Sequence, residues 1–417
     1  MIQNIKGTKD LLPEVIGKWQ YIQDVLKKIS EQYNYQEIRT PIFEKTEVFS
    51  RSIGEATDIV NKEMYTFLDK SEESITLRPE LTASIARVVL QHSLLQQSPN
   101  LRFWYFGPFF RYEQPQKGRM RQFHQYGAEC IGSQFPESDA EIIMLASRIF
   151  LSLGINDFKL IINSLGNSES RTKYREALIE FLKDNEQKLS KESQIRLQIN
   201  PLRILDSKAE NDIEILNNAP NILEFLDPES KEHFEQVLSI LDSQNLKYEI
   251  NPKLVRGLDY YSHTVFEFQS SVLGAQNSIG GGGRYNKLFS ELGGSEIPAV
   301  GLALGVERII LIMEEKGLFP NLEQRTDLYL VSLNKATQQY VIKLAEQLRG
   351  NGMIVAIDLL RRSVKAQMRE ANKMNAKYVI VIGEDEIKSN LLTIKDMTNG
   401  EQTQYSLTGI ADFFKNK

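Results

Sequence analysis

The sequence predicts an α+β protein in which an antiparallel body carries a helical insertion and is followed by a separate α/β unit. Up to about residue 320, short extended runs follow one another across turns, which is typical of antiparallel strands. Beyond Phe319-Pro320, strands and helices alternate, which favours a mainly parallel sheet. Between about 165 and 250 the sequence is charged, Asn-rich and mostly helical in pattern, which indicates an insertion.

Size and composition narrow the class of protein. A chain of 417 residues has room for two to three domains, and 41% hydrophobic with 25% charged residues is typical of a folded, water-soluble protein. One cysteine, Cys130, excludes a disulfide framework, and four scattered histidines predict no zinc site. The N-terminal residues lack the order of a signal peptide, and no window approaches ~18 apolar residues. We therefore expect a cytoplasmic protein without a membrane span.

The first predicted element is a packing helix over 14–33, because Trp19, Ile22, Leu26 and Ile29 recur at spacings of three and four. Alternating, apolar or aromatic runs predict strands, and runs of helical period predict helices. The strands of the body are expected at 35–39, 64–68, 75–78, 101–110, 122–131, 158–163 and 265–270. Its further helices are expected at 79–91, 138–153 and 303–315.

The second unit is expected to follow a linker near 318–326, which divides the chain into domains over 1–320 and 325–417. Its strands are expected at 327–333, 353–358 and 378–382, and its helices at 336–349 and 364–374. From Arg325 onward there are 14 Lys and Arg against 10 Asp and Glu, whereas the whole chain has a net charge of −5. This modest excess fits either ordinary surface scatter or a module that binds a polyanion.

The hairpin expected between 110 and 122 has the densest set of cations in the chain. Arg111, Lys117, Arg119 and Arg121 lie at its ends and tip. Such cations suit phosphate chemistry, because fixed donors stabilise charge on phosphoryl oxygens. The alternative for a charge run of this kind is a solvated charged hairpin.

Alternation along the following strand favours the pocket interpretation. Arg121, Phe123, Gln125, Gly127 and Glu129 are two residues apart, so they are expected to point to one face. A cation, an aromatic ring, an amide and a carboxylate on one face make a poor hydrophobic core. They predict a ligand pocket.

Three further strings are unusual. Arg256-Gly-Leu-Asp-Tyr-Tyr261 precedes a strand and fits either a site or a buried Arg–Asp pair with aromatic packing. The glycines at 280–283 lack the Lys-Ser/Thr of a phosphate loop, so close approach of a backbone to a ligand or a neighbouring strand is favoured. Glu307 and Arg308 lie at the start of an apolar helix, where an arginine is either a surface residue or an anion contact.

In this order, the strings resemble those of the bacterial-type histidyl-tRNA synthetases, which are class II aminoacyl-tRNA synthetases. The resemblance covers nearly the whole chain, and the string at 256–261 is specific to the histidine branch. The other matching strings are Lys6-Gly-Thr-Lys-Asp-Leu-Leu-Pro13, Thr40-Pro41, Leu77-Arg-Pro-Glu-Leu-Thr82, the arginine hairpin, Asn200-Pro-Leu-Arg-Ile-Leu-Asp-Ser207 and Gly301-Leu-Ala-Leu-Gly-Val-Glu-Arg308. Thr40-Pro41 is similar to the dimer-interface motif.

The resemblance implies a six-stranded antiparallel catalytic sheet with flanking helices, a helical insertion, an anticodon-binding C-terminal α/β domain and a homodimer. It implies a histidine–tRNA ligase, which forms histidyl-adenylate and pyrophosphate from L-histidine and ATP and then transfers histidine to the 3′-terminal ribose of tRNA(His). Mg²⁺ is expected with the ATP phosphates. No organic cofactor, zinc or other protein-bound metal is expected.

Site residues follow from the same resemblance, position by position. Arg111 and Arg256 are similar to the catalytic arginines, which also contact histidine. The other expected histidine-binding residues are Glu80, Leu81, Thr82, Gln125, Glu129, Tyr260, Tyr261 and Tyr285. ATP is expected to contact Arg111, Glu113, Arg119, Phe123 and Arg308, and the tRNA acceptor end is expected at Gln114 and Gln116.

Two residues depart from the family pattern. Leu81 stands where many bacterial members have glycine, and Gln114 stands where an arginine is common in the hairpin. Two other functions share parts of the pattern. One is a non-catalytic histidine-binding paralogue of the ATP phosphoribosyltransferase regulatory subunit type, and the other is a class II enzyme that joins a different carboxylate to another acceptor. The string at 256–261 and the C-terminal unit favour the synthetase.

Overall fold

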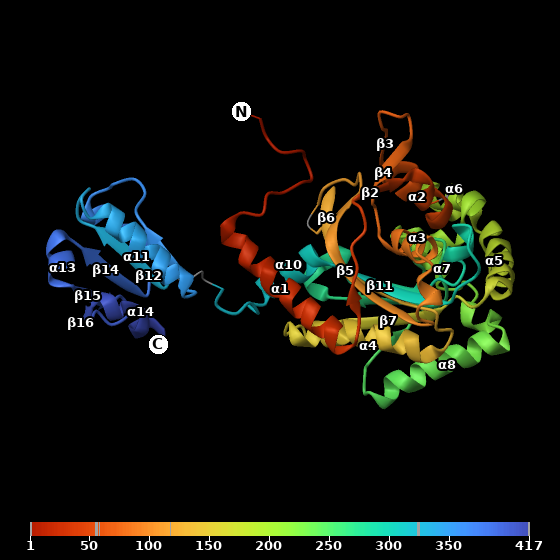
Figure 1. The fold of residues 1–417 in the computed structure, drawn as a ribbon. Helices are drawn as coiled ribbons and strands as arrows, with labels where there is room; N and C mark the ends of the chain where they lie inside the picture. Colours follow the sequence, from red (N-terminus) through yellow and green to blue (C-terminus); the bar gives the residue numbers. More distant parts are fainter. Residues whose placement is uncertain (1, 55–56, 58, 117, 323–325, 416–417) are drawn as a thin grey trace. The chain divides into compact units, whose positions relative to one another are not determined.

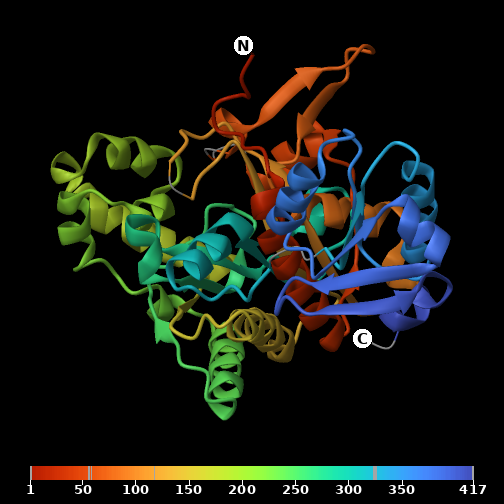
Figure 2. The same cartoon turned by 90° about the vertical axis from the view of Figure 1, so that its left-hand side faces the viewer.

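The computed structural model describes residues 2–54, 57, 59–116, 118–322 and 326–415. The chain divides into two compact units, Met1–Pro320 and Asn321–Lys417, and each can be followed in Figures 1 and 2. Residues 323–325 of the expected linker, and Lys117 of the hairpin, lie outside the described part. Among the helices of the described part, none combines the length and the apolar character that crossing a bilayer requires.

The N-terminal unit is built on an eight-stranded sheet in the order β1-β5-β6-β11-β10-β9-β7-β8. Its six inner strands pair antiparallel throughout, whereas the edge strands β1 (Gln36–Glu37) and β8 (Glu249–Ile250) pair parallel. The inner strands are β5 (Leu101–Phe110), β6 (Gln122–Ile131), β7 (Lys159–Ser164), β9 (Ser262–Gln269), β10 (Ser278–Arg284) and β11 (Ala299–Gly305). The expected six-stranded antiparallel sheet is confirmed, with one short parallel strand added at each edge.

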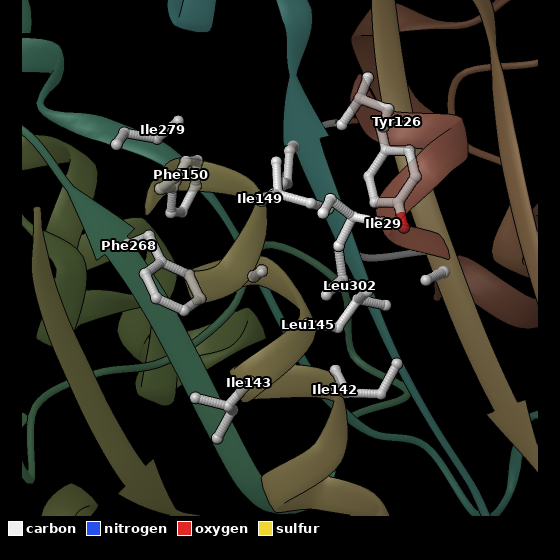
Figure 3. Packing of buried hydrophobic residues seen from close by; sticks show 14 of the residues in the cluster. Ile29, Tyr126, Ile142, Ile143, Leu145, Ile149, Phe150, Phe268, Ile279 and Leu302 are labelled. Carbon is white, nitrogen blue, oxygen red and sulfur yellow. The ribbon is translucent and has the colours of Figure 1, made fainter. Parts of the chain in front are cut away.

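Four helices pack against this sheet around the largest hydrophobic core: α1 (Pro13–Gln32), α4 (Pro136–Ser152), α8 (Pro228–Ser243) and α10 (Val306–Glu315). Figure 3 shows Ile149 and Phe150 of α4 beside Phe268 of β9 and Tyr126 of β6. Along β6, the even-numbered residues 126, 128 and 130 belong to this core. Because side chains alternate along a strand, the odd-numbered residues are left for the opposite face.

The expected insertion contains the α-helices α5 (Ser168–Lys183), α6 (Lys191–Ile199) and α7 (Glu210–Leu216), and short 3₁₀ helices over Glu186–Lys188, Pro201–Asp206 and Ile222–Phe225. The N-cap side chains of Asn167 and Ser190 accept hydrogen bonds from backbone N–H groups of α5 and α6. Helix α8 lies inside the range predicted as insertion, but its Phe234, Val237 and Leu241 belong to the same core as α4. Its apolar stripe therefore makes α8 part of the body.

A three-stranded sheet in the order β2-β4-β3 joins β2 (Phe43–Lys45), β3 (Tyr65–Leu68) and β4 (Ser74–Leu77). Figures 1 and 2 both show the β3–β4 hairpin projecting from the unit. Helix α2 (Thr46–Ile53) follows β2, and the short α9 (Leu288–Glu291) follows β10.

The prediction that a helix opens at Pro79 is wrong, because α3 runs over Thr82–Gln91. The Glu80 carboxylate accepts hydrogen bonds from the N–H groups of Thr82 and Ala83, at 2.7 and 3.0 Å, and so caps this later start.

The region from 278 to 315 differs from the prediction in one respect. The expected helix at 303–315 begins only at Val306, since residues 299–305 form β11 between β6 and β10. The glycine run forms the middle of β10, where a Cβ on Gly282 would lie 1.9 Å from the carbonyl oxygen of Gly301. Close approach to a neighbouring strand, one of the two possibilities that the sequence left open, accounts for this glycine.

The C-terminal unit has a five-stranded sheet in the order β13-β12-β14-β15-β16. Its strands are β12 (Leu328–Ser332), β13 (Val355–Ile357), β14 (Tyr378–Ile382), β15 (Leu391–Asp396) and β16 (Gln402–Ser406), and its helices are α11 (Gln338–Gly350), α12 (Val364–Lys373), α13 (Glu384–Ser389) and α14 (Ile410–Lys415). Pairing is parallel between β12 and its two neighbours but antiparallel from β14 to β16. The sheet is therefore mixed, and the prediction of a mainly parallel sheet missed a final hairpin whose turn contains Asn399-Gly400.

Candidate active site

A cavity of about 670 Å³ opens on the face of the large sheet opposite the α4 core. Odd-numbered β6 residues reach it from below, together with residues of β5, β9, β10 and β11. The loop at 256–261, the arginine hairpin and the insertion surround it. Of the residues expected in the site, it is lined by Glu80, Leu81, Thr82, Arg111, Glu113, Arg119, Phe123, Gln125, Arg256, Tyr260, Tyr261, Tyr285 and Arg308.

The cavity has buried acceptors at the start of α3. Glu80 is 4% exposed, and burial raises the pKa of its carboxyl group above the usual value, against the lowering effect of the bonds from Ala83 and Thr82. The Thr82 hydroxyl donates to Glu129 at 2.9 Å. Glu80 is thus held by backbone donors with its carboxylate at the cavity, where a cationic group would find an acceptor.

Glu129 is fully buried and lies beneath the cavity floor; it is not among the lining residues. Three hydroxyl groups donate to its carboxylate: Tyr285 at 2.5 Å, Thr82 at 2.9 Å and Tyr105 at 3.2 Å. Burial raises the pKa of Glu129 to about 8, although the hydroxyl donors act in the opposite direction. Glu129 can therefore act on a ligand through the hydroxyl groups of Tyr285 and Thr82, which line the cavity.

The raised pKa of Glu129 predicts how wild-type stability compares with that of Glu129→Gln. The folded state binds a proton more tightly than the unfolded state, whose Glu pKa is near 4.5. The stabilisation by the neutral carboxyl group is complete below pH 4.5 and is lost as the pH rises through 8. We expect the free energy of unfolding of the wild type, relative to the glutamine variant, to fall steadily between pH 5 and 8.5 in urea titrations. A difference that is constant or rises with pH would contradict the raised pKa.

Three tyrosines form an aromatic wall of the cavity. The rings of Tyr260 and Tyr261 have centroids 4.7 Å apart, and the centroids of Tyr260 and Tyr285 are 5.7 Å apart. Burial raises the pKa of all three phenols, so they stay neutral and can donate hydrogen bonds. A planar ligand with ring nitrogens would fit such a wall.

The cavity also has a group of cationic side chains. Arg111 donates through Nε to the Pro79 carbonyl oxygen at 2.9 Å, and its guanidinium lies 5.3 Å from the centroid of the Phe123 ring. Arg308, at the start of α10, donates to the carbonyl oxygens of Gly118 and Ser278. Burial, and then repulsion from the neighbouring Arg119, lowers the pKa of Arg308 from its usual value. Cations gathered in this way favour the binding of an anionic ligand.

Glu307 ties the start of α10 to the large sheet. Its carboxylate accepts the backbone N–H of His124 at 2.9 and 3.0 Å, which ties the first turn of the helix to β6. Arg308 is thereby held over the cavity. The alternative that Arg308 is a surface residue is excluded by its place in the cavity lining.

Arg256 pairs with a carboxylate that the sequence did not point to. Its Nη1 donates to Oε2 of Glu267, on β9, at 2.7 Å, and both side chains are mostly buried. Asp259 instead accepts a hydrogen bond from Asn200 at 3.0 Å. The alternative of an Arg–Asp pair within the string is therefore wrong. Arg256 Nε is buried and has no hydrogen-bond partner in the described part of the protein.

Several expected residues lie elsewhere. Gln114 and Gln116 are on the hairpin but do not line the cavity, and Gln116 forms a bridge with Arg119. Arg121 also lies outside the lining, because β6 begins one residue later and its guanidinium lies 3.9 Å from the centroid of the Tyr112 ring. The predicted alternation thus holds from 123 onward but not at 121.

Sequence patterns missed other residues of the cavity. Tyr105, on β5, donates to Glu129, and Glu267 pairs with Arg256. The only sequence signal for these two residues was the alternation of side chains between the two faces of their strands. The insertion contributes Ser190, Glu192, Arg196 and residues 206–209, for which no sequence pattern predicted a place at the cavity.

The six-stranded antiparallel sheet, the arginine hairpin and the arginine at the start of α10 converge on one cavity. Together they define a class II aminoacyl-tRNA synthetase. Comparison with protein-family models agrees: one described as histidyl-tRNA synthetase matches residues 7–309, and one described as an anticodon binding domain matches residues 327–417.

Full-length relatives give the same result. The chain is 47% identical to a histidine–tRNA ligase of Halothermothrix orenii, across 98% of this chain and 97% of that one. It is 46% identical to a histidine–tRNA ligase of a Cyanothece species, across 99% and 95% of the two chains. The crystal structure of apo S. aureus histidyl-tRNA synthetase matches with a TM-score of 0.85 and 40% identity, and each chain is covered over 100% of its length. The chain therefore belongs to the histidyl-tRNA synthetase family.

Proposed function

We propose that the cavity catalyses both steps of histidyl-tRNA synthesis. In the first step, a carboxylate oxygen of L-histidine attacks the α-phosphorus of ATP, the bond to the bridging oxygen of the β-phosphate breaks, and pyrophosphate leaves. In the second, the 3′-terminal ribose of tRNA(His) attacks the acyl carbon and AMP leaves. The observation that carries this proposal is one cavity that is lined both by the buried acceptors Glu80 and Thr82 and by Arg111, Arg256 and Arg308.

The chemistry of the first step needs no nucleophilic side chain. Its barrier depends on holding two anions in line and on stabilising charge that develops on phosphoryl oxygens. We assign Arg111 and Arg256 to the α-phosphate and the histidine carboxylate. Arg119 and Arg308 are assigned to the leaving phosphates, with Glu113 nearby, and Phe123 to stacking of the adenine.

Mg²⁺ is proposed to enter with the ATP phosphates, where it would neutralise part of their charge. The cavity carboxylates beside the arginines, Glu113 and Glu267, have the hard oxygen donors that this ion takes. Each of these carboxylates lies within 4.0 Å of a cavity arginine, so both also orient cations in the protein alone.

For the amino acid, we assign Glu80, Thr82 and Gln125 to the ammonium group, with Leu81 beside them. Tyr261 is assigned to one imidazole nitrogen, and Glu129 to the other through the hydroxyl groups of Tyr285 and Thr82 that donate to it. Tyr260 and Tyr285 are assigned to the walls. A hydroxyl group that donates to Glu129 can itself accept from an imidazole N–H group, and a phenol can serve the other nitrogen. A site that pairs both nitrogens leaves buried groups unsatisfied with ligands that lack them, which gives selectivity.

Replacement of Glu129 by glutamine tests this assignment. The variant keeps the shape of the side chain but replaces one acceptor oxygen by an NH₂ donor, so we expect the KM for histidine to rise by about tenfold or more. The KM for ATP should change little. Pyrophosphate-exchange kinetics at varied histidine and varied ATP measure both constants.

A matched control is Glu141→Gln, which removes a partly buried glutamate of α4 that pairs with Arg102. That variant should leave both constants unchanged. If Glu129→Gln changes both constants by the same factor, Glu129 is a scaffold residue and the assignment fails.

The second step needs the acceptor end of tRNA at the cavity and the anticodon at the C-terminal unit. We assign Gln114 and Gln116, on the exposed hairpin, to the acceptor end. The absence of the arginine common at position 114 leaves an uncharged contact there. The match of residues 327–417 to an anticodon binding domain supports the second assignment.

We also propose that the active form is a cytoplasmic homodimer. The sheet of β2, β3 and β4 follows the Thr40-Pro41 motif and leaves large apolar side chains exposed at Ile42, Phe43, Phe67 and Leu68. These side chains are 44–66% exposed, which suits burial against a second copy.

ATP–pyrophosphate exchange across the twenty amino acids tests the function. Exchange with histidine alone is expected. Exchange with another amino acid would contradict the specificity. Histidine binding without any exchange would replace the proposal by a non-catalytic histidine-binding paralogue.

A further inference from the structure

The string Asn200–Ser207 of the insertion contacts the 256–261 loop and reaches the cavity at Asp206 and Ser207. Its 3₁₀ helix over Pro201–Asp206 has about three residues per turn, so Asn200, Arg203 and Asp206 are expected on one side of it. The buried Pro201, Ile204 and Leu205 face the protein interior. One side of the string is thus polar and the other apolar, and the polar side is available to the loop.

Side chains of this string bind the 256–261 loop directly. Nδ2 of Asn200 donates to Oδ1 of Asp259 at 3.0 Å, and Nη2 of Arg203 donates to the carbonyl oxygen of Gly257. Arg171, from α5, adds a bond from Nη1 to the carbonyl oxygen of Tyr261 at 2.9 Å. Three insertion side chains therefore hold the loop at its second, fourth and last residues.

The far end of the string is anchored as well. The Ser207 hydroxyl donates to the buried carboxylate of Asp212, at 2.6 Å, and the same carboxylate accepts bonds from Ser190 and Ser193. Burial opposes ionisation there, but the serine donors outweigh it and the pKa of Asp212 is lowered. Residues 206–209 then line the cavity. The string is therefore fixed to the insertion at one end while it holds the loop at the other.

The loop needs such support because it lies between β8 and β9 and has no regular secondary structure of its own. It carries Arg256, Tyr260 and Tyr261 into the cavity. Misplacement of a catalytic group by about 1 Å can cost about 10²-fold in rate. Hydrogen bonds from a second, independently anchored segment are a physical means of preventing that misplacement.

We propose that Asn200 and Arg203 are positioning residues for histidine activation, and that they act through Asp259 and Gly257 on Arg256 and the two tyrosines. The proposal rests on the proposed function of the cavity and extends the site into the insertion. It assigns a role to the Asn200–Ser207 string, which the reaction chemistry itself does not use.

The Asn200–Asp259 bond is tested by a double-mutant cycle in the full-length protein, with Asn200→Ala, Asp259→Ala and the pair. We expect each single variant to lower kcat/KM for histidine by about 10- to 100-fold. The double variant should be little worse than either single variant, because both remove one interaction. Asp259→Asn, which retains an acceptor oxygen, should recover most of the loss. Fully additive single effects would overturn the proposal.

The kinetic pattern separates positioning from loss of folded protein. Arg203→Ala should lower kcat and raise the KM for histidine, with a smaller change in the KM for ATP, because the triphosphate contacts are assigned to other arginines. Loss of folded protein would lower the apparent kcat and leave both KM values unchanged, and that result would overturn the proposal. Arg203→Lys, which keeps a donor, should lie between alanine and wild type.

Matched controls come from the same insertion. Arg175 is exposed on α5, and Asn218 is exposed just after α7. They are the same residue types as Arg203 and Asn200, but they do not bind the loop. Their alanine variants should keep wild-type exchange, and effects equal to those of Asn200→Ala and Arg203→Ala would refute a specific role. If the wild type itself shows no histidine-dependent exchange, the proposed function fails. If the wild type is active and Asn200→Ala and Arg203→Ala are equally active, only this inference fails.

Discussion

Replacement of Arg256 by alanine should leave the fold intact and lower the rate of adenylate formation by about 10²- to 10³-fold. A fixed cation beside developing phosphoryl charge is worth about 3–4 kcal/mol in the transition state. The structure adds that Arg256 is already oriented by Glu267 and keeps a buried Nε donor without a partner in the described part of the protein. Rapid-quench measurement of histidyl-adenylate under pre-steady-state conditions gives the rate directly.

The partner of Arg256 has to be controlled separately. Removing the arginine leaves the Glu267 carboxylate without its cation, so part of any loss could come from the carboxylate. Arg256→Ala with Glu267→Gln should be as slow as Arg256→Ala alone, because the phosphate contact is what is missing. Arg148→Ala, on the exposed side of α4, should keep the wild-type rate. A loss below tenfold in a folded Arg256 variant would return this residue to a structural role.

Deletion of residues 325–417 should preserve histidine-dependent pyrophosphate exchange and lower the rate of tRNA charging by about 10²-fold or more. Residues 1–320 form a compact unit that contains the whole cavity, whereas the match to an anticodon binding domain begins later in the sequence, at residue 327. Contacts between cations and RNA phosphates provide much of the affinity for tRNA. Aminoacylation at subsaturating tRNA, beside exchange on the same preparation, measures the two effects. Equal charging by both forms, if both are dimeric, would contradict the prediction.

Helix α12 allows a finer test in the full-length chain. Lys365, Arg369 and Lys373 are exposed and four residues apart, so they form one stripe along the helix. Arg362, which lies just before the helix, is paired with Asp358 and Glu370 and does not belong to this stripe. Reversing the charge of the stripe should weaken tRNA binding and lower its salt dependence, by about one unit of slope per cation. Reversal of Lys343 on α11 and Lys388 on α13 is the matched control.

Elements with a strong local pattern were predicted best. The strands predicted at 101–110 and 122–131 have these bounds in the structure, and helix α12 ends within one residue of its prediction. Strand alternation and helical period are properties of neighbouring residues, so they can be recognised without a partner. Strand β11 and the β15–β16 hairpin were missed, since their extended form depends on pairing with strands far away in the sequence.

The residues of the candidate site also fall into those that the sequence could predict and those that it could not. By itself, the sequence determined which chemical groups are present and, through its resemblance to one family, which positions to examine. Most of those positions line one cavity, but Gln114 and Gln116 do not, and Glu129 lies beneath its floor. A local sequence pattern cannot distinguish a residue that lines the cavity from one that lies beneath its floor. The burial of a side chain depends on which distant parts of the chain pack over its strand.

Only the tertiary structure decided which residues are partners. Arg256 pairs with Glu267, and the Asn200–Ser207 string meets the 256–261 loop across a sequence separation of more than 50 residues. Such pairings arise from sheet order and from the packing of the insertion, neither of which leaves a periodic signal in the residues involved. The sequence by itself therefore determined the chemistry available to this protein, and the tertiary structure decided which of its charged groups face a ligand and which hold one another in place.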